Sequence, residues 1–512
     1  MRGPAASVLF GAMLTACISF LHTAAWATPL DFIAVGDPLE DEIRVLEVSG
    51  VPVRLPHLGM RPLQVLDLPA LDQTLPGVAE IARQRLLRSI ARDRGILAVP
   101  GATPRLLEIQ EPEDERLEFS AGIDGRGTVA RGRRPILESG SGVRLRFAAQ
   151  VGRWLAFTDI DAAHVEGADR YAERILNNDA ALLTDQSSIS YTGERGRWGV
   201  SLGRGRWSWG PGDEGSLVLS KTSPSYSALA FHLRIEALRA DGMILNATLR
   251  DPSGMQMAAH RLEWQPMDGL RVGYTEAVRY RASTWSPLYL AGVIPFSMVQ
   301  NLLSKDEPDS LAANRNNVIA AGDVAWRVAP GTRFYSEILI DDLRTDNAHI
   351  VSKYAYQLGW EGVGTVRGTR VTWDTELTRL TRFVYTSFND RSFVIAGEPL
   401  GFPTGPDSRR LRVRAAWDPR VDVQLDAIAT RTDRGESGLD SVYVPGSPRV
   451  DVASFAGVVE STRHFEVGFR YWPASGIDVR LAAGSDWVRN VDHVEGADRT
   501  EPFATLGVRL TR

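Results

Sequence analysis

The feature that most constrains the fold is a hydrophobic period of two, which begins near residue 117 and continues to the end of the sequence. Segment 231–237 is typical, because His232, Arg234 and Glu236 share one face and the apolar residues between them share the other. The same alternation recurs at residues 411–415, 421–427 and 477–481, and less strictly at 334–341, where Leu339 interrupts the polar face. Because the side chains of a β-strand point alternately to its two faces, residues 116–512 are predicted to be all-β.

A soluble β-sandwich alternates in the same way, so the N-terminal residues decide between a sandwich and a membrane barrel. Arg2 supplies a positive charge, residues 8–20 form an apolar core, and Ala25-Trp26-Ala27 is a small-x-small cleavage site. We therefore expect residues 1–27 to be an export signal peptide. Lipidation of Cys17, the only cysteine of the sequence, is an alternative form of processing.

Aromatic residues near the predicted strand ends favour a membrane barrel, because such barrels carry aromatic girdles at both interfaces. They are Trp207, Tyr289, Trp360, Trp373, Phe383, Tyr385, Trp417, Tyr471 and Trp472. Strands of about 10 residues, with connections of similar length, divide the region into about 18 antiparallel strands. The predicted fold is an all-β transmembrane barrel with an aqueous or plugged lumen, in the outer membrane of a Gram-negative bacterium.

Residues 28–115 differ from the rest and are predicted to form a small periplasmic α-helical domain. Apolar residues recur there at helical spacing, at Ile43, Leu46, Val78, Ile81, Leu86, Leu87 and Ile90. The acidic run at 111–115 is typical of an exit linker. The domain could contact a periplasmic polysaccharide-export protein or cap the mouth of the barrel.

Composition and missing motifs restrict the possible functions. The formal net charge of −5 argues against nucleic acid as a partner. The sequence contains no phosphate loop, dinucleotide fingerprint, His-Glu-x-x-His, Gly-x-Ser-x-Gly or cysteine cluster. We therefore expect no cofactor, no metal and no enzymatic activity, although a serine triad can assemble in space without such a motif.

Several segments, in order along the chain, together match one family pattern. They are a helix, glycine and proline-rich entry at 46–62, Trp-Ser-Trp-Gly-Pro-Gly at 207–212, Gly-Ser-Leu-Val-Leu-Ser at 215–220, Tyr-Ser-Glu-Ile-Leu-Ile-Asp-Asp at 335–342, and Gly-Glu-Pro-Leu-Gly at 397–401 with Gly-Pro-Asp at 405–407. This set resembles the capsule assembly Wzi family. The chain departs from the family at Asn316-Asn317, where an Asp-Asn pair is expected.

The resemblance implies an outer-membrane barrel with a periplasmic helical bundle and no known catalysis. It also implies a lectin that binds or organises capsular or extracellular polysaccharide at the cell surface. Outer-membrane lipids are a further expected partner. Two alternatives remain open: a porin for small solutes or oligosaccharides, in which inward charges tune selectivity, and an outer-membrane hydrolase.

Candidate polysaccharide-binding residues come from the aromatic turn and the polar strand faces. They are Arg206, Trp207, Trp209, Glu337, Asp341, Asp374, Glu376, Arg412 and Arg414. Charged groups offer hydrogen bonds to sugars, and aromatic rings can stack on sugar faces. A structural interpretation stands beside this one, in which the rings pack a Gly-Pro-Gly turn and the carboxylates pair with luminal arginines. The carboxylates at 337, 341 and 342 would also suit a calcium site or glycosidase chemistry, but ion pairing is the commoner arrangement.

One heptapeptide, His-Val-Glu-Gly-Ala-Asp-Arg, occurs at both 164–170 and 493–499. Each copy follows a predicted strand and has a loop-like composition, which predicts a position on a rim of the barrel. The side chains available for a sugar or a cation are His164, Glu166, Asp169, His493, Glu495 and Asp498. A short duplication without a role is the alternative.

Overall fold

The structure is a computed structural model that describes most of the chain. It covers residues 32–51, 59–64, 74–94, 107–111, 115–130, 142–164, 174–177, 180–249, 254–303, 316–342, 351–388, 391–444, 446–473 and 477–511. The predicted signal peptide and Cys17 lie outside these residues.

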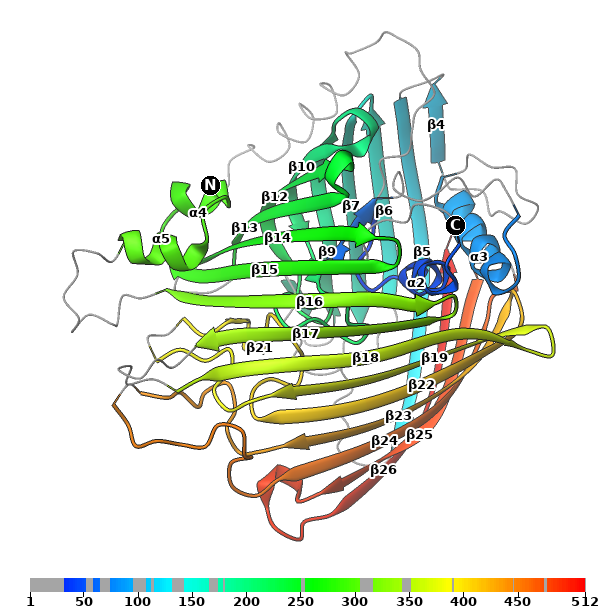
Figure 1. The fold of residues 1–512 in the computed structure, drawn as a ribbon. Helices are drawn as coiled ribbons and strands as arrows, with labels where there is room; N and C mark the ends of the chain where they lie inside the picture. The colour runs from blue at the N-terminus through cyan, green and yellow to red at the C-terminus, as the bar shows by residue number, and fades with distance from the viewer. Residues whose placement is uncertain are drawn as a thin grey trace.

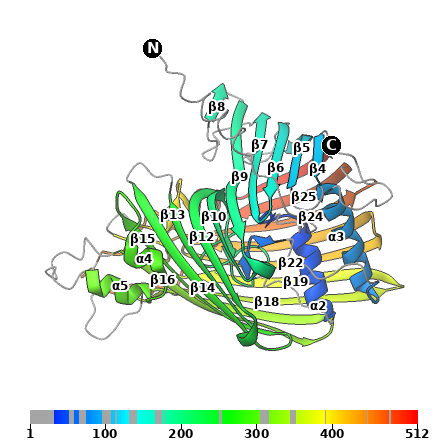
Figure 2. The same cartoon turned by 90° about the horizontal axis from the view of Figure 1, so that it is seen from above.

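Eighteen antiparallel strands form a closed barrel in the described part of the chain, which confirms the predicted fold class (Figures 1 and 2). They are β5 (Glu115–Ala130), β6 (Gly142–Val151), β7 (Trp154–His164), β9 (Ala180–Thr192), β10 (Trp198–Gly205), β12 (Tyr226–Ile235), β13 (Ala240–Thr248), β14 (Met255–Met267), β15 (Leu270–Arg281), β16 (Asn317–Ala329), β17 (Thr332–Asp342), β18 (Lys353–Val366), β19 (Thr369–Leu380), β22 (Ser408–Arg420), β23 (Val423–Arg434), β24 (Glu460–Tyr471), β25 (Ile477–Arg489) and β26 (Arg499–Thr511). Pairing of β26 with β5 closes the ring, with Phe503 opposite Ala130.

Several short strands pair with the barrel strands or with one another. β8 (Arg174–Asn177) pairs with β9, and β4 (Leu107–Glu111) pairs with β5, with Glu111 opposite Glu115. The acidic run at 111–115, predicted as a linker, therefore joins two paired strands. The other short strands are β1 (Phe32–Ile33), β2 (Met60–Arg61), β3 (Leu63–Gln64), β11 (Ser208–Trp209), β20 (Val394–Ile395) and β21 (Glu398–Pro399).

The period of two separates a lumen face from a lipid face. In β17, Arg333 and Glu337 are buried inside, whereas Phe334 and Ile338 on the outer face are 46% and 53% exposed. Leu339 also points inward, where it joins a hydrophobic core. Exposed apolar side chains and buried charges are the reverse of a soluble protein, and they fit a wall that meets lipid outside.

The outer wall carries an aromatic girdle near the short turns. Trp264, Trp326, Trp360 and Trp417 are 43–50% exposed there, and Phe334 stacks on Trp360 with ring centroids 6.2 Å apart. The prediction of a girdle is therefore confirmed for Trp360 and Trp417. It is wrong for Trp207 and Tyr385, which are buried in a core inside the barrel.

The two ends of the barrel differ in the length of their connections. Tight turns at 152–153, 330–331, 367–368 and 421–422 join strands at one end, and long connections at 206–225, 282–316, 381–407 and 435–459 join them at the other. Outer-membrane barrels place short turns in the periplasm and long loops outside. We name the two ends the short-turn end and the long-loop end.

Helices α2 (Leu39–Ser49) and α3 (Val78–Arg94) lie at the short-turn end (Figure 1). Ile43 and Leu46 of α2 and Leu86 of α3 are fully buried in one core, which Val363 of the wall joins. Gly50 ends α2 in the left-handed conformation that favours glycine. The predicted helical segment thus packs into the mouth of the barrel. The side chain of Ile90 lies outside the described part.

Polar residues of α2 pair with the barrel wall. Glu42 contacts Arg370 at 2.6 Å and Arg44 contacts Glu361 at 2.6 Å. Glu47 contacts Arg271 at 3.2 Å. A largely buried helix can carry these charges because each one meets a partner of opposite charge.

Helices α4 (Pro287–Ala291) and α5 (Phe296–Leu303) pack against the outside of the wall at the long-loop end (Figures 1 and 2). Ala258 shares a face of β14 with the exposed Leu262, yet it is fully buried because Phe296 and neighbouring helix residues cover it. Glu276 accepts hydrogen bonds from the backbone N–H groups of Phe296 (2.8 Å) and Ser297 (3.2 Å). None of the described helices is both long and apolar enough to span a membrane.

Candidate functional site

Two long connections, which we call the plug segments, fold into the barrel: residues 206–225 and residues 381–407. They pack against inward-facing wall residues that include Leu245, Met257 and Leu339. Their own residues in this core include Trp209, Leu217, Leu219, Tyr385, Phe393, Leu400 and Phe402. The lumen beside these wall strands is therefore packed like a protein interior.

Trp209 lies at the centre of the first plug segment and is fully buried. Its backbone N–H donates to the carbonyl of Leu219 at 2.9 Å, and β11 pairs with β2 of the N-terminal segment. The buried Arg61 of β2 donates to the hydroxyl of Ser208 at 2.8 Å. The Trp-Gly-Pro-Gly turn thus connects the plug to the N-terminal segment, and Trp209 has no contact with solvent.

The predicted carboxylates Glu337 and Asp341 bind the backbone of both plug segments. Glu337 accepts a hydrogen bond from the N–H of Leu217 at 3.1 Å, and Asp341 accepts one from the N–H of Tyr385 at 2.7 Å. The hydroxyl of Tyr385 donates to the carbonyl of Leu217 at 2.6 Å, which joins the two segments. A third bond runs from the N–H of Phe402 to this hydroxyl at 3.0 Å.

Three more predicted residues surround Asp213 of the first plug segment. Arg412 contacts Asp213 at 2.9 Å and Asp374 at 2.8 Å, and Glu376 accepts from the N–H of Asp213 at 3.1 Å. Burial opposes the charge of Asp213, but nearby cations, led by Lys221 and Arg412, hold its pKa well below the usual range. An ionised carboxylate inside the barrel is thus stabilised by its neighbours.

Arg414 connects the wall to the helices, because it contacts Asp41 of α2 at 3.2 Å. A cavity of about 60 Å³ lies beside this pair and is lined by charged residues of the helix and the wall. Arg44 and Glu361 are among them. The cavity has room for a few water molecules.

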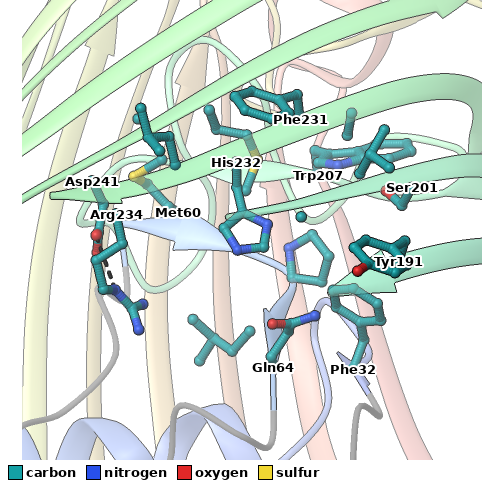
Figure 3. A pocket seen from close by; sticks show the side chains of 18 residues that line it. Phe32, Met60, Gln64, Tyr191, Ser201, Trp207, Phe231, His232, Arg234 and Asp241 are labelled. Carbon is teal, nitrogen blue, oxygen red and sulfur yellow. Dashed lines mark hydrogen bonds and ion pairs between the residues drawn. The ribbon is translucent and has the colours of Figure 1, made fainter. Parts of the chain in front are cut away.

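Trp207 borders two adjoining cavities between the plug and the wall strands β6 to β13. The cavities share Phe32, Pro62, Ser201 and Trp207 as lining residues, and Arg206 lines the second. Figure 3 shows the first, with Arg234 hydrogen-bonded to Asp241. Trp207 is only 6% exposed and stacks on Tyr226, with centroids 5.1 Å apart. Volumes of about 60 and 70 Å³ have room for a few water molecules each.

Aromatic side chains also gather at the long-loop end, which sequence reasoning did not identify as a site. Phe383 and Tyr443, from two different long connections, lie with ring centroids 5.9 Å apart, and we call them the outer aromatic pair. Phe388, on the same connection as Phe383, is 40% exposed. The two rings of the pair are 60 residues apart in sequence, so no local pattern could reveal their contact.

Asp407 holds the connections of the outer aromatic pair together. It is fully buried and accepts a hydrogen bond from the N–H of Ala456 at 2.9 Å. It is the last residue of the Gly-Pro-Asp motif, which the sequence singles out without a role.

The second copy of the heptapeptide lies at the long-loop end. The ring of His493 contacts the carbonyl of Val458 at 2.8 Å, and Asp498 accepts from the N–H of Asn490 at 3.3 Å. Glu495 is exposed. The first copy begins with His164 at the end of β7, a strand that runs toward the same end. The side chain of His164, and Glu166 and Asp169, lie outside the described residues.

Among the residues that the structure describes, no group of three or more His, Cys, Asp or Glu side chains is arranged to hold a metal ion. Of the carboxylates considered for a calcium site, Glu337 and Asp341 accept backbone hydrogen bonds, and Asp342 contacts Lys353 at 2.7 Å.

One solved structure supports the architecture. Wzi of Escherichia coli, described as an outer membrane protein involved in group 1 capsule assembly and as a carbohydrate-binding β-barrel, is similar with a TM-score of 0.65 and 13% identity, over 94% of this chain and 99% of its own. OprD of Pseudomonas aeruginosa matches with a TM-score of 0.42 and 9% identity, over 77% of this chain and 95% of its own. OccD3 (OpdP) of the same species matches with a TM-score of 0.43 and 9% identity, over 81% of this chain and 97% of its own.

Sequence comparison identifies the family. No curated protein matches this chain, but the family model of the capsule assembly protein Wzi matches residues 135–502. The matched region contains nearly the whole barrel and both plug segments. The chain is therefore an outer-membrane barrel that belongs to the capsule assembly protein Wzi family.

Proposed function

We propose that this protein binds an extracellular or capsular polysaccharide at the long-loop end of its barrel and helps to attach or assemble it at the cell surface, without catalysis. The observation that carries the proposal is the outer aromatic pair, Phe383 and Tyr443, with the exposed Phe388 on the same connection. Aromatic rings at this end can stack on sugars from outside the cell. Membership of the Wzi family, in which the Escherichia coli protein is described as carbohydrate-binding, supports it.

The buried residues predicted to bind sugar have a different role in this proposal. Glu337, Asp341 and Glu376 accept hydrogen bonds from plug backbone, and Arg412 and Asp374 surround a plug carboxylate. We propose that they position the plug segments and thereby the connections that carry the outer aromatic pair. Direct contact of these residues with sugar remains a prediction.

A channel is the second candidate, and the adjoining cavities that Arg206 and Trp207 line are the observation in its favour. Passage of a solute would require the plug segments to move, because they pack against the inner face of the wall. Conductance in planar bilayers separates the candidates: the binding protein should show little current, and a porin should show steady open steps.

The test of the main proposal is binding of purified, detergent-solubilised protein to the surface polysaccharide of its native host. A Phe388→Ala, Tyr443→Ala double variant should bind about tenfold more weakly, since each ring contributes a stacking contact. Phe334→Ala, which removes a ring of similar exposure from the lipid face, is the matched control and should bind normally. Equal binding by the double variant and wild type would refute the proposed site, and no binding by folded wild type would refute the function. Release of new reducing ends from the polysaccharide would instead favour the hydrolase.

A further inference from the structure

The outer wall at the long-loop end carries a group of arginines that polysaccharide binding does not explain. Arg409, Arg431, Arg463 and Arg489 lie on the four neighbouring strands β22 to β25, and we call them the arginine cluster. The side chains of Arg409 and Arg431 are 48% and 51% exposed, and Arg463 and Arg489 are also exposed.

These arginines point away from the lumen. Arg463 shares its face of β24 with Phe465 and Val467, which are 44% and 48% exposed apolar residues of the lipid face. Arg409 shares its face of β22 with Leu411, which is 42% exposed. The arginine cluster therefore borders the apolar band of this part of the wall on the side of the long-loop end.

The height of the arginine cluster matches the lipid headgroups of the outer leaflet. Trp417 belongs to the girdle at the short-turn end, and from Trp417 to Arg409 the strand climbs roughly 20 Å at the tilt usual in such barrels. The apolar band of an outer-membrane barrel is about 25 Å tall. The guanidinium groups thus lie where the acyl chains of the outer leaflet end and the polar headgroups begin.

The charges of the arginine cluster are incompletely balanced. Arg431 and Arg463 are directly opposite each other on adjacent strands, an arrangement of like charges that destabilises a sheet. Asp433 contacts Arg409 at 2.7 Å and Arg431 at 3.1 Å, so one carboxylate is shared by two arginines. Within the described residues Arg463 and Arg489 make no ion pair. An anion bound between the strands would remove the repulsion.

We propose that the arginine cluster binds the phosphate-bearing headgroup of an outer-leaflet glycolipid, whose acyl chains lie on the apolar wall below. Arginine suits this ligand because its planar guanidinium can make paired hydrogen bonds to phosphate oxygens. Phe465, Val467 and Leu411 supply the apolar surface for the acyl chains. The arginine cluster adjoins the apolar lipid face, which a glycolipid needs for its acyl chains. A free anion would need only the charges.

The test compares lipid retention by wild type and by an Arg431→Gln, Arg463→Gln double variant in detergent micelles, with native mass spectrometry as the readout. The probes are bisphosphorylated lipid A and its dephosphorylated form. Wild type should prefer the bisphosphorylated form, and the double variant should lose about tenfold in affinity for it, the effect of one charge-assisted contact. Arg420→Gln removes an exposed arginine from the same sheet at the short-turn end and should retain the preference.

Three outcomes would overturn the proposal. Wild type retains both forms of lipid A equally, inorganic phosphate displaces the lipid as well as the lipid itself does, or the double variant loses polysaccharide binding but keeps the lipid. Heat-modifiable mobility on gels confirms that each variant is a folded barrel. If the double variant does not fold, Arg489→Gln, which has no partner to lose among the described residues, replaces it with the same expectation.

Discussion

Arg370 of β19 donates two hydrogen bonds to Glu42 of α2, with N–O distances of 2.6 and 3.0 Å. Arg85 of α3 contacts the same carboxylate at 2.8 Å and Asp418 of β22 at 2.7 Å. Arg370 also contacts Asp418, at 2.5 Å. These four buried groups form a closed ring of ion pairs that connects both helices to the wall.

Glu42→Gln should release the helices from the mouth of the barrel. The substitution leaves Arg85 and Arg370 buried with one carboxylate between them, and breaking a buried pair costs about 3–5 kcal/mol. Hydrogen exchange over α2 and α3 should therefore speed up while exchange in the barrel strands stays the same. Asp422→Asn, in an exposed pair at the same end, should cost less than about 1 kcal/mol. Unchanged exchange in Glu42→Gln would contradict the role of the ring.

Acid should weaken the attachment of α2 and α3 to the barrel wall. Burial opposes the charge of Glu42, but Arg370 and Arg85 outweigh burial and lower its pKa from 4.5 to about 2. A carboxyl with a depressed pKa in the folded state stabilises that state above its ordinary pKa and loses this contribution as pH falls through the lower value. Helix exchange should thus accelerate between pH 4.5 and 2, and Glu42→Gln should lack this step. A pH-independent wild type over this range would show that another contact holds the helices.

Tyr385→Phe should loosen the plug. Its hydroxyl donates to Leu217 and accepts from Phe402, so its removal leaves a buried carbonyl and a buried N–H without their bond, at a cost of about 1–3 kcal/mol. We expect brief current steps in planar bilayers that wild type rarely gives. Tyr274→Phe, on the lipid face, is the control and should behave like wild type. If wild type already conducts steadily, the plug segments do not close the lumen.

Glu276→Leu should detach α4 and α5 from the outer wall. The carboxylate accepts from the N–H groups of Phe296 and Ser297, and hydrogen bonds to a charged group contribute about 1.5–3 kcal/mol each. Protease should then cut within residues 282–303 of the reconstituted variant, and wild type should resist. Ser297→Ala keeps both backbone bonds and should resist as well, whereas cleavage of wild type at the same rate would show that the helices do not pack on the wall.

The sequence predicts the barrel well because the period of two reports which face of a strand meets lipid. The face of β17 that carries Tyr335, Glu337 and Asp341 is inward, as the alternation requires. The period does not say what fills the lumen, because plug segments and open loops have similar composition. The sequence therefore predicts a membrane girdle position for Trp207 and Tyr385, although both are buried inside.

The partners of luminal charges are also beyond local sequence patterns. Glu42 and Arg370 are separated by 328 positions, and only the closed barrel brings them together. The structural interpretation predicts luminal arginines as the partners of these carboxylates, whereas Glu337 and Asp341 accept hydrogen bonds from backbone N–H groups. A backbone N–H is present at every residue except proline, so no residue type marks it in advance.

Gly210→Ala should disrupt the turn that carries Trp209. Gly210 has a φ of 141°, in a region that residues with a side chain rarely adopt. An added Cβ would lie 2.8 Å from a carboxylate oxygen of Glu337 and 3.0 Å from Ser216. The substitution should therefore cost about 1–3 kcal/mol and weaken the hydrogen bond between Glu337 and the plug. We expect a lower thermal unfolding temperature and more current in planar bilayers. Gly322→Ala, where a Cβ meets nothing within 4 Å, is the matched control and should leave both unchanged. Equal stability of the two variants would mean that the turn tolerates a side chain and that its glycine serves another purpose.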